Sequence, residues 1–158
     1  MSQYQLLDNV SRWLNQEEYT HIPEKNEDSV FRIKVEDSSG IHIFEPKKQK
    51  GVLVIELAIN IPTKLDNLYK KYSDNEKKKL KKDMEENARQ EEIELRFFSG
   101  AEGIKSNLYI VIDNKENLHF TFFKEQLDKI TEVGDIIGQF LICIAAGNAS
   151  DLKQQKGR

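Results

Sequence analysis

Residues that commonly carry out catalysis or bind metals are few in this chain and lie far apart. The three histidines, His21, His42 and His119, have no second His, Cys or paired carboxylate at the spacing that metal ligands need. A zinc site would therefore require ligands from distant segments. We interpret the histidines as surface or half-buried residues, and only His42 falls in a predicted strand, where it could line a binding face.

The single cysteine and the acidic pairs also favour structural roles. Cys143 lies between Ile142 and Ile144 in an apolar run, without a neighbouring base to stabilise its thiolate. We expect a core thiol, and one cysteine cannot form an intrachain disulfide. Adjacent carboxylates such as Glu85 and Glu86 do not face each other on a helix. Because the common nucleotide-binding and hydrolase motifs are also missing from the sequence, we predict no catalytic residue, no metal site and no cofactor.

The spacing of apolar residues predicts the order helix, three strands, helix, two strands, helix. Spacing of three and four residues predicts a first helix over residues 6–14. The polar residues 19–28 have no periodicity and are predicted to form a loop. Alternation of apolar and polar residues predicts five strands, at residues 30–35, 41–44, 51–61, 93–98 and 108–112.

Two further helices complete this order. Ser73 and Glu76 match a capping box. A charged helix follows with a narrow apolar stripe of Leu80, Met84 and Ala88. The last helix is predicted over residues 121–146, with Thr121 as its N-cap and Gly147 as its C-terminal stop.

This order is typical of an α+β fold, here a mainly antiparallel five-stranded sheet with helices packed on it. A length of 158 residues suits one domain, since domains usually contain about 100–150 residues. We predict a single domain over residues 1–150 and a polar tail over residues 151–158.

The charge distribution argues against nucleic acid and membrane partners. Charged residues make up 32% of the chain, but its net charge is only -3, and residues 62–94 carry nine positive and nine negative charges. We interpret the lysine run at residues 77–82 as part of a salt-bridged exposed helix. The apolar run at residues 136–146 is shorter than the about 20 residues that a membrane span needs. The lone cysteine and the absence of a signal-like start favour a cytoplasmic protein.

Two apolar surfaces exceed what a minimal core requires. The second half of the last helix has an additional stripe, formed by Val133, Ile136 and Phe140. We favour the interpretation that the first helix covers this stripe, and a homodimer contact is the alternative. The outer face of the sheet combines aromatic, aliphatic and arginine residues, a mixture typical of protein interfaces, at Phe44, Val54, Arg96, Phe98, Tyr109 and Val111. The alternative is that the charged middle helix covers this face.

Three segments resemble a known family: RWLNQEE in the first helix, LYKKYSDNEKKKL after the third strand, and LYIVIDNKENL before the last helix. Together with the order of elements, they resemble the fold of type III secretion chaperones. More specifically, they resemble an uncharacterised archaeal family of small proteins of about this length. The resemblance implies a non-enzymatic protein-binding role, often as a dimer.

Our leading hypothesis is therefore a cytoplasmic module that binds a partner protein or peptide through the outer sheet face, as a chaperone-like protein or an adaptor. A homodimer is an open alternative for the partner. The alternative function is an enzyme or small-ligand-binding protein with a pocket assembled from distant residues. Its polar candidates would be His42, Arg96, Tyr109 and His119.

Overall fold

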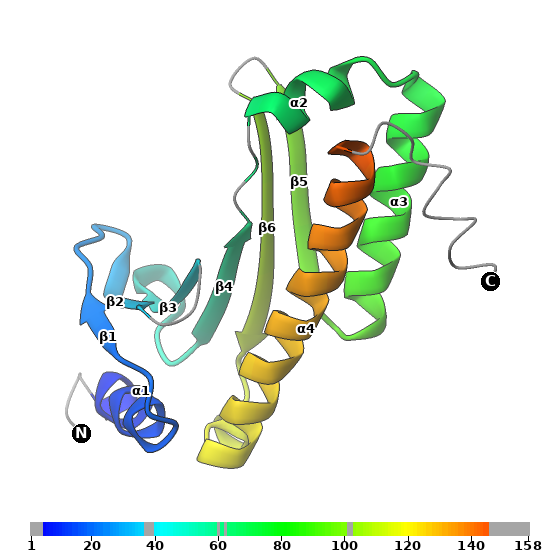
Figure 1. Cartoon of the computed structure of the whole chain (residues 1–158). Coiled ribbons are helices and arrows are strands. Elements are labelled where there is room, and N and C mark those ends of the chain that lie inside the picture. Colours follow the sequence, from blue (N-terminus) through cyan, green and yellow to red (C-terminus); the bar gives the residue numbers. More distant parts are fainter. Residues whose placement is uncertain (1–4, 37–39, 60, 62, 101–102, 146–158) are drawn as a thin grey trace. The chain divides into compact units, whose positions relative to one another are not determined.

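The structure, a computed structural model, describes residues 5–36, 40–59, 61, 63–100 and 103–145 (Figure 1). The backbone forms two compact units, which are described separately. The first unit comprises residues 1–58 and 109–130, and the second comprises residues 59–108 and 131–158. The prediction of a single domain stays a prediction.

The first unit contains the first helix and most of the strands. In chain order its complete or nearly complete elements are α1 (Gln5–Gln16), β1 (His21–Pro23), β2 (Ser29–Val35), β3 (Ile41–Pro46), the 3-10 helix η1 (Lys47–Gln49), β4 (Leu53–Ile59) and the 3-10 helix η2 (Lys115–Asn117). The end of β6 (Gly103–Ile112) and the start of α4 (Phe120–Ala145) also belong to it.

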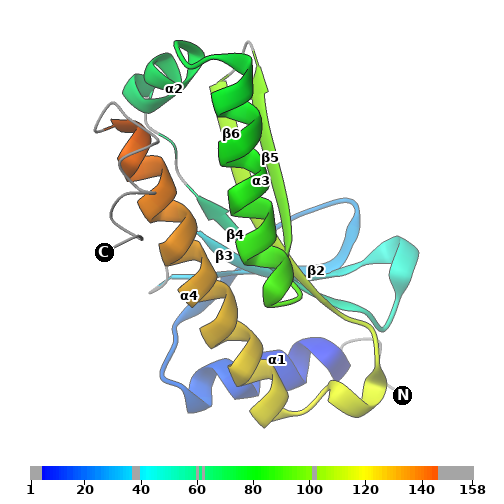
Figure 2. The ribbon, with the colours of Figure 1, turned by 90° about the vertical axis from the view of Figure 1, so that its right-hand side faces the viewer.

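The second unit contains α2 (Thr63–Lys70), α3 (Asp74–Gln90) and β5 (Glu94–Gly100), with the rest of β6 and α4. Ser73 and Glu76 form the predicted capping box at the start of α3. The predicted apolar stripe of α3 is buried, and Figure 2 shows α3 running along β5. The ring of Tyr69 packs edge-on against Phe97 of β5, at 5.6 Å between centroids.

The strands form an antiparallel sheet in the order β1-β2-β3-β4-β6-β5. The α+β class is confirmed, but the prediction of five strands is wrong, because β1 forms inside the predicted loop. The predicted order of elements is also wrong, because two helices, α2 and α3, lie between β4 and β5 where one helix was predicted. The backbone N–H of Glu24 donates to Arg32 O at 2.7 Å and that of Glu36 to Thr20 O at 2.9 Å, which extends the β1–β2 pairing. A strand of three residues is too short to show alternation, so no local pattern predicts it.

The core of the first unit lies on one face of β2, β3 and β4. Ile33, Ile43 and Ile55 are neighbours across these strands and are buried. Trp13 of α1 packs against Phe123 of α4, with 5.2 Å between ring centroids. The aromatic contact of α1 is therefore with the first turns of α4. The prediction that α1 covers the second half of α4 stays a prediction.

The start of α4 differs from the prediction. Thr121 is not the N-cap, because the helix begins at Phe120. The ring of His119 takes this role, since Phe122 N–H donates to His119 Nδ1 at 3.3 Å and Phe123 N–H to His119 O at 3.0 Å. The predicted stop at Gly147 and the predicted polar tail lie outside the described residues.

Replacing Glu92 with glycine should stabilise the protein. Glu92 follows α3 with φ of 59°, and Glu92 N–H and Ile93 N–H close the helix by donating to the carbonyls of Arg89 and Ala88. Glycine adopts this left-handed conformation without strain, so we expect Glu92→Gly to raise the free energy of unfolding by about 0.5–1 kcal/mol in urea denaturation. Glu91→Gly is the matched control, because φ of Glu91 is -101°, and it should not stabilise. Equal effects of the two substitutions would contradict this explanation.

Candidate functional site

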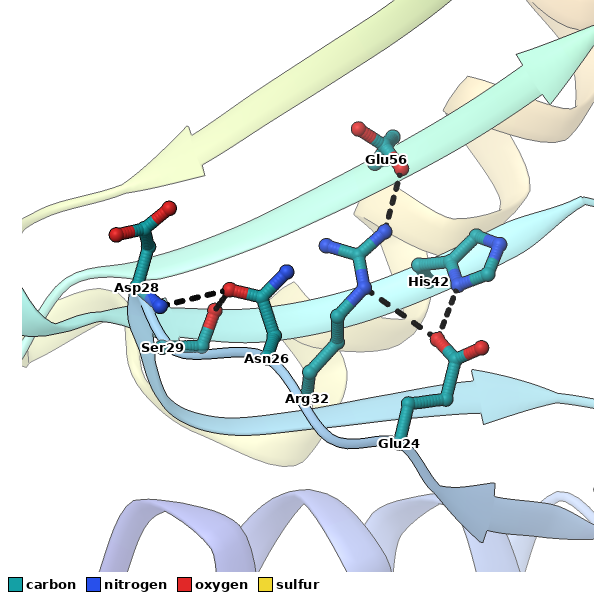
Figure 3. Close-up of polar contacts among 7 residues, drawn as sticks. All are labelled: Glu24, Asn26, Asp28, Ser29, Arg32, His42 and Glu56. Atoms are coloured by element: carbon teal, nitrogen blue, oxygen red, sulfur yellow. Dashed lines mark hydrogen bonds and ion pairs between the residues drawn. The ribbon is translucent and has the colours of Figure 1, made fainter.

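Four polar side chains meet on the outer face of the first unit's sheet, opposite Ile33, Ile43 and Ile55. The strand register places Arg32 opposite Phe44, and His42 opposite both Lys34 and Glu56. Glu24 reaches this face from the residue after β1. We name Glu24, Arg32, His42 and Glu56 the polar cluster (Figure 3).

Two donors of the polar cluster converge on a single carboxylate oxygen. His42 Nδ1 lies 2.7 Å from Glu24 Oε1, and Arg32 Nε lies 3.3 Å from the same atom (Figure 3). Because an ionised carboxylate only accepts hydrogen bonds, we assign the ring hydrogen to Nδ1 of His42. This arrangement recognises a carboxylate with two donors from neighbouring strands.

The guanidinium group of Arg32 is held by two further contacts. Its Nη2 donates to Glu56 Oε1 at 2.9 Å, and its Cζ lies 4.8 Å from the centroid of the Phe44 ring. The side chains of Arg32 and Glu56 are only 17% and 13% exposed. Charged groups with this burial are stabilised by pairing and hydrogen bonding, and the aromatic ring adds a cation–π contact. Arg32 is therefore the centre of the polar cluster.

The loop that carries Glu24 is stabilised by hydrogen bonds to the side chain of Asn26, which belongs to the same loop. Asn26 Oδ1 accepts hydrogen bonds from Asp28 N–H at 2.9 Å and from Ser29 Oγ at 3.3 Å (Figure 3). Asn commonly closes turns in this way, by replacing a backbone acceptor. The backbone of the loop is thus anchored independently of the Glu24 carboxylate.

The surroundings of Glu24 lower its pKa. Burial alone would raise this pKa, but the hydrogen bonds and the electrostatic attraction from His42 and Arg32 outweigh that effect. The net pKa of Glu24 is lower than the ordinary value of 4.5. Glu24 is consequently ionised at neutral pH and acts as a hydrogen-bond acceptor.

Replacing Glu24 with glutamine should destabilise the protein at neutral pH and much less in acid. A carboxylate whose pKa is lowered in the folded state stabilises that state above its ordinary pKa of 4.5. The contribution is lost as the pH falls through the folded pKa. We expect Glu24→Gln to lower the free energy of unfolding by about 1 kcal/mol at pH 7. Urea denaturation at pH 7 and at successively lower pH measures this difference.

Glu27→Gln is the matched control for this prediction. Glu27 is an exposed residue of the same loop, so its replacement makes the same change in net charge. We expect an effect within about 0.5 kcal/mol, as for other exposed substitutions. If the loss of stability caused by Glu24→Gln grew as the pH falls, the lowered pKa of Glu24 could not be its cause.

The predicted partner-binding residues of the first unit differ in their accessibility. Phe44 and Val54 lie directly opposite each other on β3 and β4, but Val54 is buried and Phe44 is half-buried against Arg32. On β6, Tyr109 is half-buried and Val111 is 52% exposed. Val111 is thus the most accessible of these four residues.

The other two predicted partner-binding residues, Arg96 and Phe98, lie on β5 in the second unit. Both are exposed, and Phe98 is 62% exposed, whereas Phe97 on the opposite face of the strand is buried. Arg96 Nε lies 3.5 Å from Glu94 Oε1 on the same face. Helix α3 therefore packs on the Phe97 face of β5 and leaves Phe98 uncovered.

The predicted dimer-contact residues lie in the part of α4 that belongs to the second unit. Val133 and Phe140 are buried within the chain, and Ile136 is half-buried. Their role in a dimer stays a prediction. Cys143 is half-buried, so it is more accessible than the core thiol that we expected.

The histidines named as candidates for a pocket have separate structural roles. His42 belongs to the polar cluster, and His119 caps α4. Among the described residues, no group of three or more His, Cys, Asp or Glu side chains is arranged to hold a metal ion. The alternative of a small-ligand site or an enzyme stays a prediction.

Of the polar cluster only His42 was a named candidate from the sequence; Arg32 was not, and neither were Glu24 and Glu56. Glu24 lies in the predicted loop, where an isolated acidic residue gives no signal. Glu56 gave a weak sequence signal, because it is the single charged residue of the strand LVIELAI. Only the pairing of β1, β2, β3 and β4 brings these residues to Arg32 and His42.

The fold and the polar cluster define an α+β protein with a six-stranded antiparallel sheet and a charged outer face. The chain belongs to the family described as "Uncharacterized conserved protein (DUF2299)", which matches residues 6–140. The fold is similar to that in the crystal structure of an uncharacterized protein from Methanothermobacter thermautotrophicus, with a TM-score of 0.75 and 12% sequence identity. The similarity covers 86% of this chain and 96% of that archaeal protein.

The search of curated proteins found no match to this chain. No helix within the described part of the chain combines the length and apolar character that crossing a membrane demands. The family and the structural neighbour therefore establish the relationship and the fold, and the function has to be argued from the surface.

Proposed function

We propose that this chain is a non-enzymatic protein-binding module, chaperone-like or adaptor-like, that uses the outer face of its strands. The observation that carries the proposal is the exposure of Val111 at 52% and Phe98 at 62%. Each lies within a regular strand whose opposite face is buried. Covering such side chains with a partner removes apolar surface from water, at about 25 cal/mol per Å².

Other residues on the strands of the first unit also suit a protein interface. Tyr109 lies two residues before Val111 on the same face of β6, and Arg32 of β2 packs on the ring of Phe44 of β3. Tyrosine, phenylalanine and arginine are enriched at protein interfaces. The resemblance to type III secretion chaperones supports the same class of function. The proposal includes a cytoplasmic location, for which the single cysteine is the support.

The test begins with proteins captured by the wild-type chain from its native organism, each then purified for a direct binding assay. We expect Val111→Lys to weaken this binding at least about tenfold, because it places a charge in a contact that excludes water. Circular dichroism should show an unchanged fold, since Val111 is already exposed. Asn15→Lys, at an exposed position of α1, is the control and should bind like the wild type.

Phe98→Lys tests the second unit in the same assay. Light scattering shows whether the partner is a different protein or a second copy of the chain. If neither substitution weakens the binding of any purified partner, the outer strand face is not the interface. If no purified protein binds the wild type directly and the chain is a monomer, the proposed function is wrong.

A further inference from the structure

The polar cluster has the features of a site for a carboxylate that comes from another molecule. Arg32 Nε and His42 Nδ1 both lie within hydrogen-bonding or ion-pairing distance of one oxygen, Glu24 Oε1, at 3.3 and 2.7 Å. Hydrogen bonds from a guanidinium or imidazole group to a carboxylate are assisted by charge and are stronger than those between neutral groups. The chemistry of the site therefore selects carboxylates.

Arg32 has contacts that do not involve the Glu24 carboxylate, and His42 is carried by a central strand of this part of the sheet. Arg32 is held by Glu56 Oε1 at 2.9 Å and by the ring of Phe44. His42 lies within β3, in register with Lys34 and Glu56 on its two neighbouring strands. Sites whose donors are fixed beforehand bind with less loss of conformational freedom. An incoming carboxylate would thus find the Arg32 guanidinium already in place and the His42 ring on the adjacent strand.

Glu24 is the member of the polar cluster that can leave. It lies one residue beyond β1, and its side chain is 31% exposed, compared with 17% for both Arg32 and His42. Its backbone N–H donates to Arg32 O at 2.7 Å, and Asn26 closes the loop. Rotation about the side-chain bonds of Glu24 therefore opens the site without disturbing the strands.

A further cation on the same face favours an acidic partner. Lys34 lies opposite His42 on the neighbouring strand β2 and is exposed, so it adds attraction for a negatively charged segment beside the two donors. A half-buried site with two donors suits a carboxylate better than a phosphate, which carries more charge to be neutralised.

We propose that Arg32 and His42 bind a carboxylate from an acidic segment of the partner protein, and that Glu24 occupies this position until the partner arrives. This inference rests on the proposed function, since it names the partner chemistry for the same face. Glu24 acts as an internal competitor, so its removal strengthens partner binding. The affinity for the partner should rise by a factor equal to the inverse of the fraction of wild-type molecules in which the Glu24 side chain is turned away from the site.

The probe for this test is a fluorescein-labelled hexaglutamate peptide, and its binding is followed by fluorescence anisotropy at low salt. Glu24→Gln should tighten binding about fivefold relative to the wild type, which corresponds to removing a modest ion pair. Glu27→Gln removes the same charge from the same loop and should bind like the wild type. A labelled hexaglutamine peptide should bind none of the three proteins. Equal gains in the two variants would overturn the proposal, because they would show only a general charge effect.

A second substitution in the Glu24→Gln background tests the donors. Adding Arg32→Lys keeps the positive charge but removes the planar guanidinium group, and it should abolish the fivefold gain. Adding His42→Gln should do the same, and it serves as the test if the Arg32→Lys protein does not fold by circular dichroism. A gain that persists in both double variants would overturn the proposal. Inorganic phosphate that displaces the peptide at lower concentration than free glutamate would overturn the assignment to carboxylates.

The two proposals can fail separately. If Val111→Lys weakens partner binding but Glu24→Gln does not strengthen binding of the peptide, the protein-binding function stands and the carboxylate site is wrong. If Glu24→Gln selectively strengthens peptide binding while Val111→Lys and Phe98→Lys leave the partner bound, the carboxylate site stands and the proposed interface is wrong.

Discussion

Replacing Gly40 with alanine should lower the free energy of unfolding by about 3 kcal/mol or more. Gly40 precedes β3 with φ of +87°, and a Cβ atom at this position would overlap with the carbonyl oxygen of Ala58. This oxygen belongs to the backbone of β4, so it cannot rotate away as the end of a side chain can. The substitution adds the strain of the left-handed conformation, about 1–2 kcal/mol, to a steric clash of similar size.

The clash also affects a hydrogen bond of the sheet. The N–H of Ala58 donates to the carbonyl oxygen of Gly40 at 2.9 Å, directly after the Ile41–Leu57 pair of β3 and β4. Relief of the clash therefore requires the two strands to separate at this end. Urea denaturation followed by circular dichroism measures the loss of stability.

Gly51→Ala separates the steric clash from the backbone strain. Gly51 has the same φ of +87°, but nothing lies within 4 Å of its potential Cβ atom. We expect a loss of only about 1–2 kcal/mol for this variant. If Gly40→Ala and Gly51→Ala lose the same amount of stability, the contact with Ala58 does not constrain the sheet.

Replacing Arg32 with methionine should cost about 2–3 kcal/mol at neutral pH. Methionine keeps much of the side-chain length and the packing on Phe44. It removes the only cation bonded to both Glu24 and Glu56 among the described contacts. Two carboxylates that are mostly screened from water then lose their common partner, and such groups are costly to leave unpaired.

The stability that the Arg32→Met variant loses relative to the wild type should become smaller as the pH falls. The positive charge of Arg32 contributes to the lowered pKa of Glu24, so its removal raises that folded-state pKa. Protonation then relieves the unpaired carboxylate as the pH falls. We expect the stability difference from the wild type to shrink below about pH 4.5, the ordinary pKa of the group.

Lys34→Met is the control for the effect of Arg32. Lys34 lies two residues further along β2 on the same face and is exposed. Its replacement changes the net charge equally and should alter the free energy of unfolding by less than about 0.5 kcal/mol. Similar losses in Arg32→Met and Lys34→Met would show that the polar cluster does not stabilise the sheet. A second check is Arg32→Met/Glu56→Gln, which should recover part of the loss.

The sequence could predict the elements that depend on near neighbours along the chain. Alternation predicted the three strands that contain Ile33, Ile43 and Ile55, and these residues are buried in the structure. Ser73 and Glu76 specify the start of α3, because a capping box involves only residues three positions apart. The α+β class followed from the order of such elements.

The candidate site could be predicted only in part. Phe98 and Val111 were named for the outer face, and both are more than half exposed. Val54 was named for the same face and is buried. Alternation along a strand predicts the face of the sheet on which a side chain lies, but not whether other residues cover that side chain. The ring of His119 at the start of α4 and the strand β1 gave no signal that local spacing could reveal.

The sequence by itself determined α1, α3, α4, most strands and the absence of familiar catalytic motifs, since these depend on residue types within a few positions. Only the tertiary structure decided that Gly40 must pass close to Ala58, and that Glu24 meets Arg32 and His42. These contacts join residues eight to eighteen positions apart in the chain, and their geometry follows from the register of paired strands. Register is set by the whole sheet, because a shift of one residue would turn every side chain to the opposite face.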